Sequence, residues 1–133
     1  MPWPQEVIPD VDTLYMRVHA RSLVNGGLHP GIFREHGGGM SMDWKRYSTP
    51  LECRDRPKAV PPEINGVLEF VAGEIRQVEP LTVIHQPDEA NQNRAHSNVY
   101  GLSSDQNKHK TRIRLQLFEL VKDWVLAPKS SST

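Results

Sequence analysis

The segment DTLYMRV, residues 12–18, carries the clearest strand pattern in the chain, because apolar side chains occupy every second position. Leu14, Met16 and Val18 project to one side of an extended backbone, and the residues between them project to the other. The segment MSMDW, residues 40–44, repeats this alternation. Both segments are therefore predicted to be strands with one buried face and one polar face.

A short helix is predicted directly after the second of these strands. Thr49, with Glu52 three residues later, forms a capping box, and Pro50 stands at the first helical position, where its missing N–H costs no hydrogen bond. The prolines of the following segment RPKAVPPE cannot continue the hydrogen-bond ladder. We therefore expect this helix over residues 50–56.

The middle of the chain predicts further strands. We expect strands over residues 66–71 and 81–86, a turn or short helix over residues 73–78, and another short strand in the segment SNVYGL, residues 97–102. Pro80 and β-branched residues mark the start and the body of the second of these strands.

The last part of the chain carries the strongest helical pattern. Apolar residues recur at the spacing of one helix face at Ile113, Leu117, Leu120, Val121 and Trp124, and Glu119, Lys122 and Asp123 lie opposite. We expect this helix to end before Pro128.

The order of these elements favours an α+β fold: a small mixed or antiparallel sheet with the C-terminal helix packed on one face. A chain of 133 residues is expected to form a single domain, residues 1–133. Its ends, about residues 1–8 and 127–133, are expected to be disordered or loosely held. The hydrophobic fraction of 37% and the 11 prolines indicate a small core with much ordered loop.

Charge and cysteine content narrow the classes of function. Lys and Arg together equal Asp and Glu, 16 each, so no overall field attracts nucleic acid or an anionic membrane. The N-terminal segment MPWPQEVIPD resembles no targeting signal, and no apolar run reaches the length of a membrane span, so we expect a cytoplasmic protein. The single cysteine, Cys53, excludes an intrachain disulfide and a Cys-rich zinc site.

Neither a metal nor a cofactor is predicted. Two histidine-containing sets were considered as metal ligands: His19, His29 and His36, and His85, Asp88 and His96. Neither set shows the compact or helical ligand spacing of known metal sites. The glycine-rich stretches lack the lysine and the serine or threonine that end a phosphate-binding loop.

Two groups of polar residues fall on predicted strand faces. Arg17, His19 and Arg21 are two residues apart along an extended segment, which suits an anionic ligand or the solvent face of an edge strand. Ser41 and Asp43 share the polar face of the second strand, where a carboxylate serves a ligand, a helix cap or a salt bridge.

A third polar group lies in the segment NQNRAHSNVYG, residues 91–101. Asn91, Asn93 and Asn98 supply donors and acceptors, Tyr100 supplies a hydroxyl, and histidine at position 96 supplies a group that handles protons near neutral pH. His85 ends the preceding strand, and the loop is long enough for His85 and His96 to approach each other. The alternative is that the asparagines satisfy the backbone of an irregular loop.

Four segments, VDTLYMRVHA, MSMDWKRYSTPLEC, VLEFVAGEIR and NRAHSNVYG, together resemble a group of small stand-alone bacterial proteins with an LFRRI-like strand, an S-x-D segment and an N-P-A-H-A-like stretch. The resemblance covers roughly residues 9–125, and the group has no assigned activity, so it implies positions and no reaction. The matching polar positions are Arg17, Ser41, Asp43, Asn93, His96 and Gly101. Arg94 replaces the proline of the group's pattern.

The first half also resembles the start of ADP-ribosyltransferase-like and related NAD-consuming toxins, in which a strand arginine and a strand serine hold the dinucleotide. Such a fold implies a late catalytic glutamate. The candidates here are Glu69, Glu74 and Glu119, none of which has a distinctive context.

Three functions follow from these residues. The favoured one is a cytoplasmic binding or accessory module of a multi-component bacterial system, which holds a polar or anionic ligand or a partner segment. Its expected ligand-binding residues are Arg17, His19, Ser41, Asn93, Asn98 and Tyr100. The alternative is an enzyme acting on a phosphate-containing substrate, a nuclease or a NAD-consuming enzyme. His96 would be its acid or base, Asp43 would orient His96 or the substrate, and Arg17 would stabilise an anionic group such as a phosphate.

The third function is nucleic-acid binding through the segment KHKTRIR, residues 108–114. Its cations are Lys108, Lys110, Arg112 and Arg114. A solvated loop that runs into the helix is the alternative interpretation of this segment. No aromatic residues are interleaved with the cations, so nucleic acid ranks behind a protein partner or a small ligand.

Overall fold

The computed structural model describes residues 2–35, 39–58, 61–102 and 107–129. Of residues 107 and 108 it describes the backbone alone. Its described residues form a five-stranded antiparallel sheet in the order β3-β1-β2-β5-β4. The strands are β1 (Thr13–His19), β2 (Gly39–Trp44), β3 (Asn65–Val71), β4 (Thr82–His85) and β5 (His96–Tyr100). The α-helices are α1 (Pro50–Asp55), α2 (Ala72–Arg76) and α3 (Asn107–Glu119). The predicted α+β fold with a C-terminal helix is confirmed.

The strand register divides the sheet into a core face and a polar face. Tyr15 lies opposite Asp43, and Asp43 lies opposite His96, so these three side chains share one face. We call it the polar face; it also carries Arg17 and Ser41, which follow at the two-residue period. The core face carries the alternating apolar residues Leu14, Met16, Val18, Met40, Met42, Trp44, Leu68, Phe70, Val83 and Val99.

Helix α3 packs on the core face. Ile113 and Leu117, one turn apart, are almost completely buried in the same cluster as the strand residues. The helix ends at Glu119, so the predicted extension through Trp124 is wrong. Leu120 N–H bonds to the carbonyl of Leu117, a three-residue turn that closes the helix.

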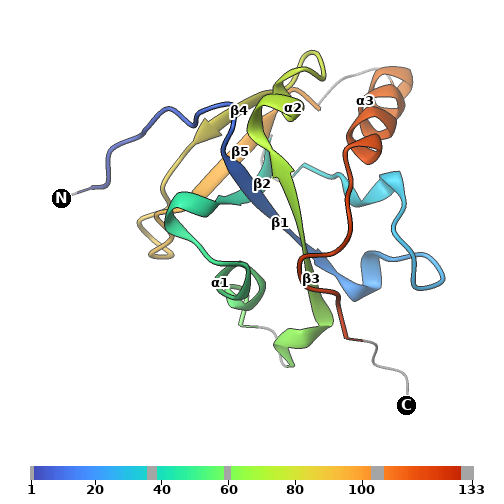
Figure 1. Cartoon of the computed structure of the whole chain (residues 1–133), viewed down its shortest axis with the longest axis horizontal. Helices are drawn as coiled ribbons and strands as arrows, with labels where there is room; N and C mark the ends of the chain where they lie inside the picture. Colours follow the sequence, from blue (N-terminus) through green and yellow to red (C-terminus); the bar gives the residue numbers. More distant parts are fainter. Residues whose placement is uncertain (1, 36–38, 59–60, 103–106, 130–133) are drawn as a thin grey trace.

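The C-terminal segment leaves the helix to pair with the edge of the sheet. The N–H groups of Val125 and Leu126 donate to the carbonyl of Val67 in β3, and Val67 N–H donates to Leu126. Trp124 packs over Gly66, where a Cβ atom would lie 2.5 Å from the indole ring. This backbone pairing satisfies the otherwise open edge of β3, which explains why the helical pattern stops short (Figure 1).

Helix α1 covers part of the opposite, polar face. Its Cys53 is buried against Tyr15 and Val67, and Figure 1 shows α1 and α3 on opposite sides of the sheet. The predicted capping box is present: Thr49 N–H donates to the Glu52 carboxylate at 2.9 Å, and Glu52 N–H donates to the Thr49 hydroxyl at 3.2 Å.

The N-terminal segment is held more firmly than its composition predicts. Ile8 is only 1% exposed and belongs to the core cluster. Glu6 N–H donates to Nδ1 of His85 at 3.0 Å. At the other end Lys129 N–H donates to the carbonyl of Glu63, while residues 130–133 lie outside the described residues. In the part of the chain that the structure describes, no helix combines the length and the apolar character needed to span a bilayer.

Candidate functional site

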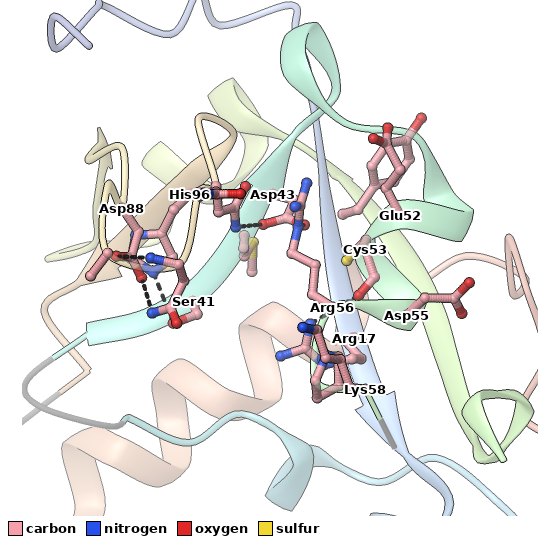
Figure 2. A pocket seen from close by; sticks show the side chains of 17 residues that line it. Arg17, Ser41, Asp43, Glu52, Cys53, Asp55, Arg56, Lys58, Asp88 and His96 are labelled. Carbon is pink, nitrogen blue, oxygen red and sulfur yellow. Dashed lines mark hydrogen bonds and ion pairs between the residues drawn. The ribbon is translucent and has the colours of Figure 1, made fainter. Parts of the chain in front are cut away.

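The polar face holds a pocket of about 900 Å³, within the size range of small-ligand sites. Strands β1, β2 and β5 form its floor, α1 and the turn after it form one wall, and the loop 88–93 forms the other. Figure 2 shows Ser41, Asp88 and His96 toward the loop and Glu52, Cys53 and Asp55 toward α1. The pocket thus gathers residues that are up to 81 positions apart in sequence, from Tyr15 to His96.

The loop 88–93 is closed by its own backbone. Asp88 and Asn93 exchange two N–H···O bonds of 2.9 Å, and the Asn91 amide donates to the Asp88 carboxylate at 2.8 Å. The latter bond is the main cause that lowers the pKa of Asp88, which favours its ionised form. The side chains of Asp88 and Asn91 therefore hold the loop itself, as the alternative interpretation of the segment NQNRAHSNVYG expects, and the side-chain oxygen of Asn93 accepts from Ala95 N–H just beyond it.

Asp43 lies at the centre of a buried hydrogen-bond network. One carboxylate oxygen accepts from the Asn93 amide at 2.9 Å, and the other accepts from the guanidinium of Arg56 and from the Ser48 hydroxyl. Arg56 also donates to Ser48 at 3.0 Å. The Asp43 carboxylate thus binds the loop 88–93 to the end of α1, and the expected pairing with His96 does not form.

His96 has different partners. Its Nδ1 lies 2.8 Å from the backbone carbonyl of Gln86, and its Nε2 lies 3.3 Å from the hydroxyl of Ser41. A carbonyl oxygen only accepts, so Nδ1 carries a proton, and in the neutral imidazole Nε2 is then the acceptor. The Ser41 hydroxyl then donates to His96, on the surface of the pocket.

Gln86 is held in turn by two residues of the polar group predicted from sequence. The amide of Asn98 and the hydroxyl of Tyr100 both donate to the side-chain oxygen of Gln86. Neither Asn98 nor Tyr100 is among the residues that line the pocket. They act on the site through Gln86.

The charged side chains of the pocket differ in whether they have a partner of opposite charge. Arg17 donates to the carbonyl of Cys53 at 2.9 Å, and within the described residues no carboxylate lies in ion-pair distance of Arg17 or Lys58. The lining carboxylates all accept hydrogen bonds from the protein: Asp43, Glu52, Asp55 and Asp88. Glu52 and Asp88 accept only from uncharged N–H groups, so among the described residues of the pocket the charges without an ion-pair partner are the cations Arg17 and Lys58 and these two carboxylates.

The other predicted residues lie away from this pocket. Strand β1 ends at His19, whose Nδ1 accepts from Arg21 N–H. Arg21 therefore lies in the turn after the strand and does not continue the row of Arg17. Neither His19 nor Arg21 lines the pocket. His85 points to the core face, where Nε2 donates to the Arg94 carbonyl at 2.7 Å. His85 and His96 therefore lie on opposite faces of the sheet.

The segment 108–114 belongs to α3 rather than to a loop. Arg114 donates to the carbonyl of Phe33 at 3.0 Å, and Arg112 bonds to Gln116 within the helix. Lys110 is partly buried and the side chain of Lys108 lies outside the described residues. Within the described residues no cluster of three or more His, Cys, Asp or Glu side chains has metal-binding geometry.

The sequence did not indicate several residues of the site, among them Arg56, Lys58 and Gln86. Arg56 and Lys58 lie at and just after the end of the short helix, where the cap pattern indicates only the helix itself. The feature of the sequence that points to Arg56 and Lys58 is the nearby apolar residue Cys53. Cys53 is buried against the sheet and ties the short helix to it, so the residues after Cys53 lie close to the polar face. Gln86 acts mainly through its backbone carbonyl. Every residue has such a group, so the sequence does not indicate this role.

No protein-family model matches this chain, and comparisons with curated proteins and with solved structures likewise find no match. Both resemblances stated from the sequence therefore stay predictions. The fold and the pocket define an α+β protein with a polar cavity on one sheet face, and the function rests on that geometry.

Cys53 offers a direct test of the contact between α1 and the sheet. Burial, followed by the negative charge of Asp43, raises the pKa of its thiol far above the ordinary value. We expect iodoacetamide to modify Cys53 in guanidinium chloride but not in the folded protein at pH 8, because the thiolate is the reactive form. Glutathione in the same solution is the control. Alkylation of the folded protein at the rate of glutathione would contradict the packing.

Proposed function

We propose that the protein is a small cytoplasmic binding module, an accessory component of a multi-component bacterial system, whose pocket holds a polar ligand by one anionic group. The observation that carries the proposal is the pair of cations Arg17 and Lys58, which share the pocket and have no carboxylate partner within the described residues. Arg56, by contrast, is neutralised by Asp43.

The anchoring of Arg17 supports this role. Its contact with the Cys53 carbonyl fixes one nitrogen of the guanidinium and leaves the rest of its donors for a ligand. A guanidinium that is already oriented loses less conformational entropy when it binds a carboxylate. Arg17 is therefore the residue that we expect to contribute most to affinity.

The backbone of the pocket adds a second support. Among the described residues three non-glycine residues have left-handed φ angles, and two of them, Lys58 and Gln92 (both φ 54°), line this pocket. Such conformations cost free energy and concentrate at binding and catalytic sites. They occur on opposite walls, one after α1 and one in the loop 88–93.

The lining carboxylates restrict the ligand. Three cations and four carboxylates line the pocket: Arg17, Arg56 and Lys58 against Asp43, Glu52, Asp55 and Asp88. At the same position a dianion such as phosphate meets roughly twice the repulsion from these carboxylates that a singly charged group meets. We therefore expect a carboxylate-bearing or zwitterionic ligand rather than a dianionic one.

An NMR titration tests the proposal with four probes of different charge: acetate, inorganic phosphate, glycylglycine and tetramethylammonium. We expect acetate and glycylglycine to shift the backbone amide signals of Arg17, Lys58 and His96, and tetramethylammonium to leave them unchanged. The Arg17→Met variant keeps the apolar stem but loses the charge-assisted hydrogen bonds, so its Kd for acetate should rise about 10- to 100-fold.

Arg54→Met is the matched control. Arg54 lies in α1, pairs with Asp55 at 2.7 Å and does not line the pocket. Its substitution should leave the Kd for acetate unchanged. Equal weakening in both variants, or equal binding in Arg17→Met and the native protein, would refute a ligand site at Arg17.

An enzyme is the second candidate, favoured by the hydrogen bond between Ser41 and His96. The phosphate-directed form of this candidate, a nuclease or NAD-consuming enzyme with Asp43 orienting His96, lacks support because Asp43 bonds to Asn93 and Arg56 instead. Nucleic-acid binding through residues 108–114 remains the third candidate. It has less support, because the guanidinium of Arg114 already donates to the backbone carbonyl of Phe33.

A further inference from the structure

We propose that Ser41 is a nucleophile activated by His96, and that the pocket carries out acyl transfer on a small carboxylic ester or thioester with an anionic group. The inference rests on the proposed function in one respect, since the same pocket and Arg17 would hold the anionic group of the substrate. It adds a reaction, a reacting atom and a chemical class of substrate.

The tautomer of His96 is the first step of the argument. Because Nδ1 donates to the Gln86 carbonyl at 2.8 Å, the lone pair of Nε2 is directed at the Ser41 hydroxyl, 3.3 Å away. A serine hydroxyl that donates to a neutral imidazole, whose other nitrogen is held by an acceptor, has the arrangement needed for nucleophilic attack. The Gln86 carbonyl takes the place that a carboxylate has in a Ser-His-Asp triad.

The second step is the rigidity of this arrangement. Gln86 and His96 are joined twice, since Gln86 N–H also donates to the His96 carbonyl at 2.9 Å. The side chain of Gln86 accepts from Asn98 and Tyr100, which limits its movement. A base positioned by strand pairing and by two further hydrogen bonds retains the orientation that proton transfer requires.

The third step is access. Ser41 is exposed, although both neighbours of Ser41 in β2 are buried in the core. Its hydroxyl lies in a pocket that is large enough for a small substrate. Among the described side chains Ser41 bonds only to His96. Ser48 and Ser97, by contrast, are buried and bond to backbone carbonyls.

The charges of the pocket favour an ester over a phosphate. The reacting carbon of an ester is neutral, so the carboxylates of the two walls do not repel it as they repel a phosphoryl dianion. With Arg17 on the anionic group of the substrate, Lys58 is the cation left for the negative charge that develops on the carbonyl oxygen.

The reaction balances with the ester and water alone. The Oγ atom of Ser41 bonds to the carbonyl carbon and its proton passes to Nε2 of His96. The bond from carbon to the leaving oxygen or sulfur then breaks, and the leaving group takes the proton from His96, which gives an acyl-serine. Water, deprotonated by His96, attacks that ester, the bond from carbon to Oγ breaks, and Ser41 regains its proton.

A fluorophosphonate probe tests the nucleophile on the full chain, because it bonds to activated serines with loss of fluoride. Intact-mass and peptide analysis should find one adduct, on Ser41. Ser41→Ala should give none, and His96→Gln should slow the modification by about 100-fold or more. Ser22→Ala is the matched control: Ser22 is partly buried outside the pocket, and its loss should leave the rate unchanged.

Acetate titration of the same samples separates this inference from the proposed function. Ser41→Ala should form no adduct while its amide spectrum stays native. A folded native protein that binds acetate but forms no adduct, or one whose Ser41 reacts equally fast in His96→Gln, would overturn the nucleophile and leave the binding function standing. Loss of both acetate binding and adduct in the folded native protein would overturn both.

Discussion

Replacing Asp43 with alanine is expected to lower the free energy of unfolding by about 3–5 kcal/mol, because one partner of a buried ion pair is lost while the other remains. Asp43 is 5% exposed and accepts hydrogen bonds from Asn93, Ser48 and Arg56. The substitution leaves the Arg56 guanidinium uncompensated and the Asn93 amide without its acceptor. Urea unfolding followed by circular dichroism measures the effect.

Asp55→Ala is the control for charge removal at the same wall of the pocket. The carboxylate of Asp55 pairs with Arg54 at 2.7 Å, but half of its side chain is exposed. An exposed ion pair contributes about 0–1 kcal/mol, so this variant should unfold close to the native midpoint. Similar losses of stability in Asp43→Ala and Asp55→Ala would contradict a central structural role for Asp43.

Replacing Leu117 with alanine should cost about 2–5 kcal/mol, since a buried leucine leaves a cavity that the surrounding core fills only in part. Leu117 is completely buried in the cluster between α3 and the core face. Its effect, measured by the same urea unfolding, reports whether α3 contributes to the single core or only lies beside it.

Leu115→Ala is the matched variant on the same helix. Leu115 is 51% exposed, so its replacement removes little packing and should change stability by about 0.5 kcal/mol or less. Both substitutions exchange leucine for alanine, and both are in the interior of α3, so helix propensity cancels in the comparison. Equal effects of the two would contradict the orientation of α3.

The strands and the first helix were predictable because local chemistry specifies them. Alternation in residues 12–18 and 40–44 fits only an extended chain with one buried face, and the structure confirms both strands. The capping box at Thr49 and Glu52 joins residues three positions apart, so it could be predicted from the sequence without any tertiary contact.

The end of α3 was not predictable in the same way. Leu120, Val121 and Trp124 continue the helical spacing, and all three are packed against the core, yet the chain leaves the helix at Glu119. The open edge of β3 at Val67 is 58 residues away from Val125 in sequence. Its unpaired backbone at Val67 competes for residues 125–126, and that competition exists only once the sheet has formed.

The sequence by itself determined the fold class, the two faces of the central strands and the presence of Arg17, Ser41 and Asp43 on the polar faces of their strands, because strand periodicity is a local property. Only the tertiary structure decided which of these side chains pair. Strand register placed Asp43 opposite His96, but the packing of α1 brought Arg56 to Asp43, and the Gln86 carbonyl directed His96 to Ser41. Hydrogen bonds depend on distances between segments far apart in the chain, which no local pattern specifies.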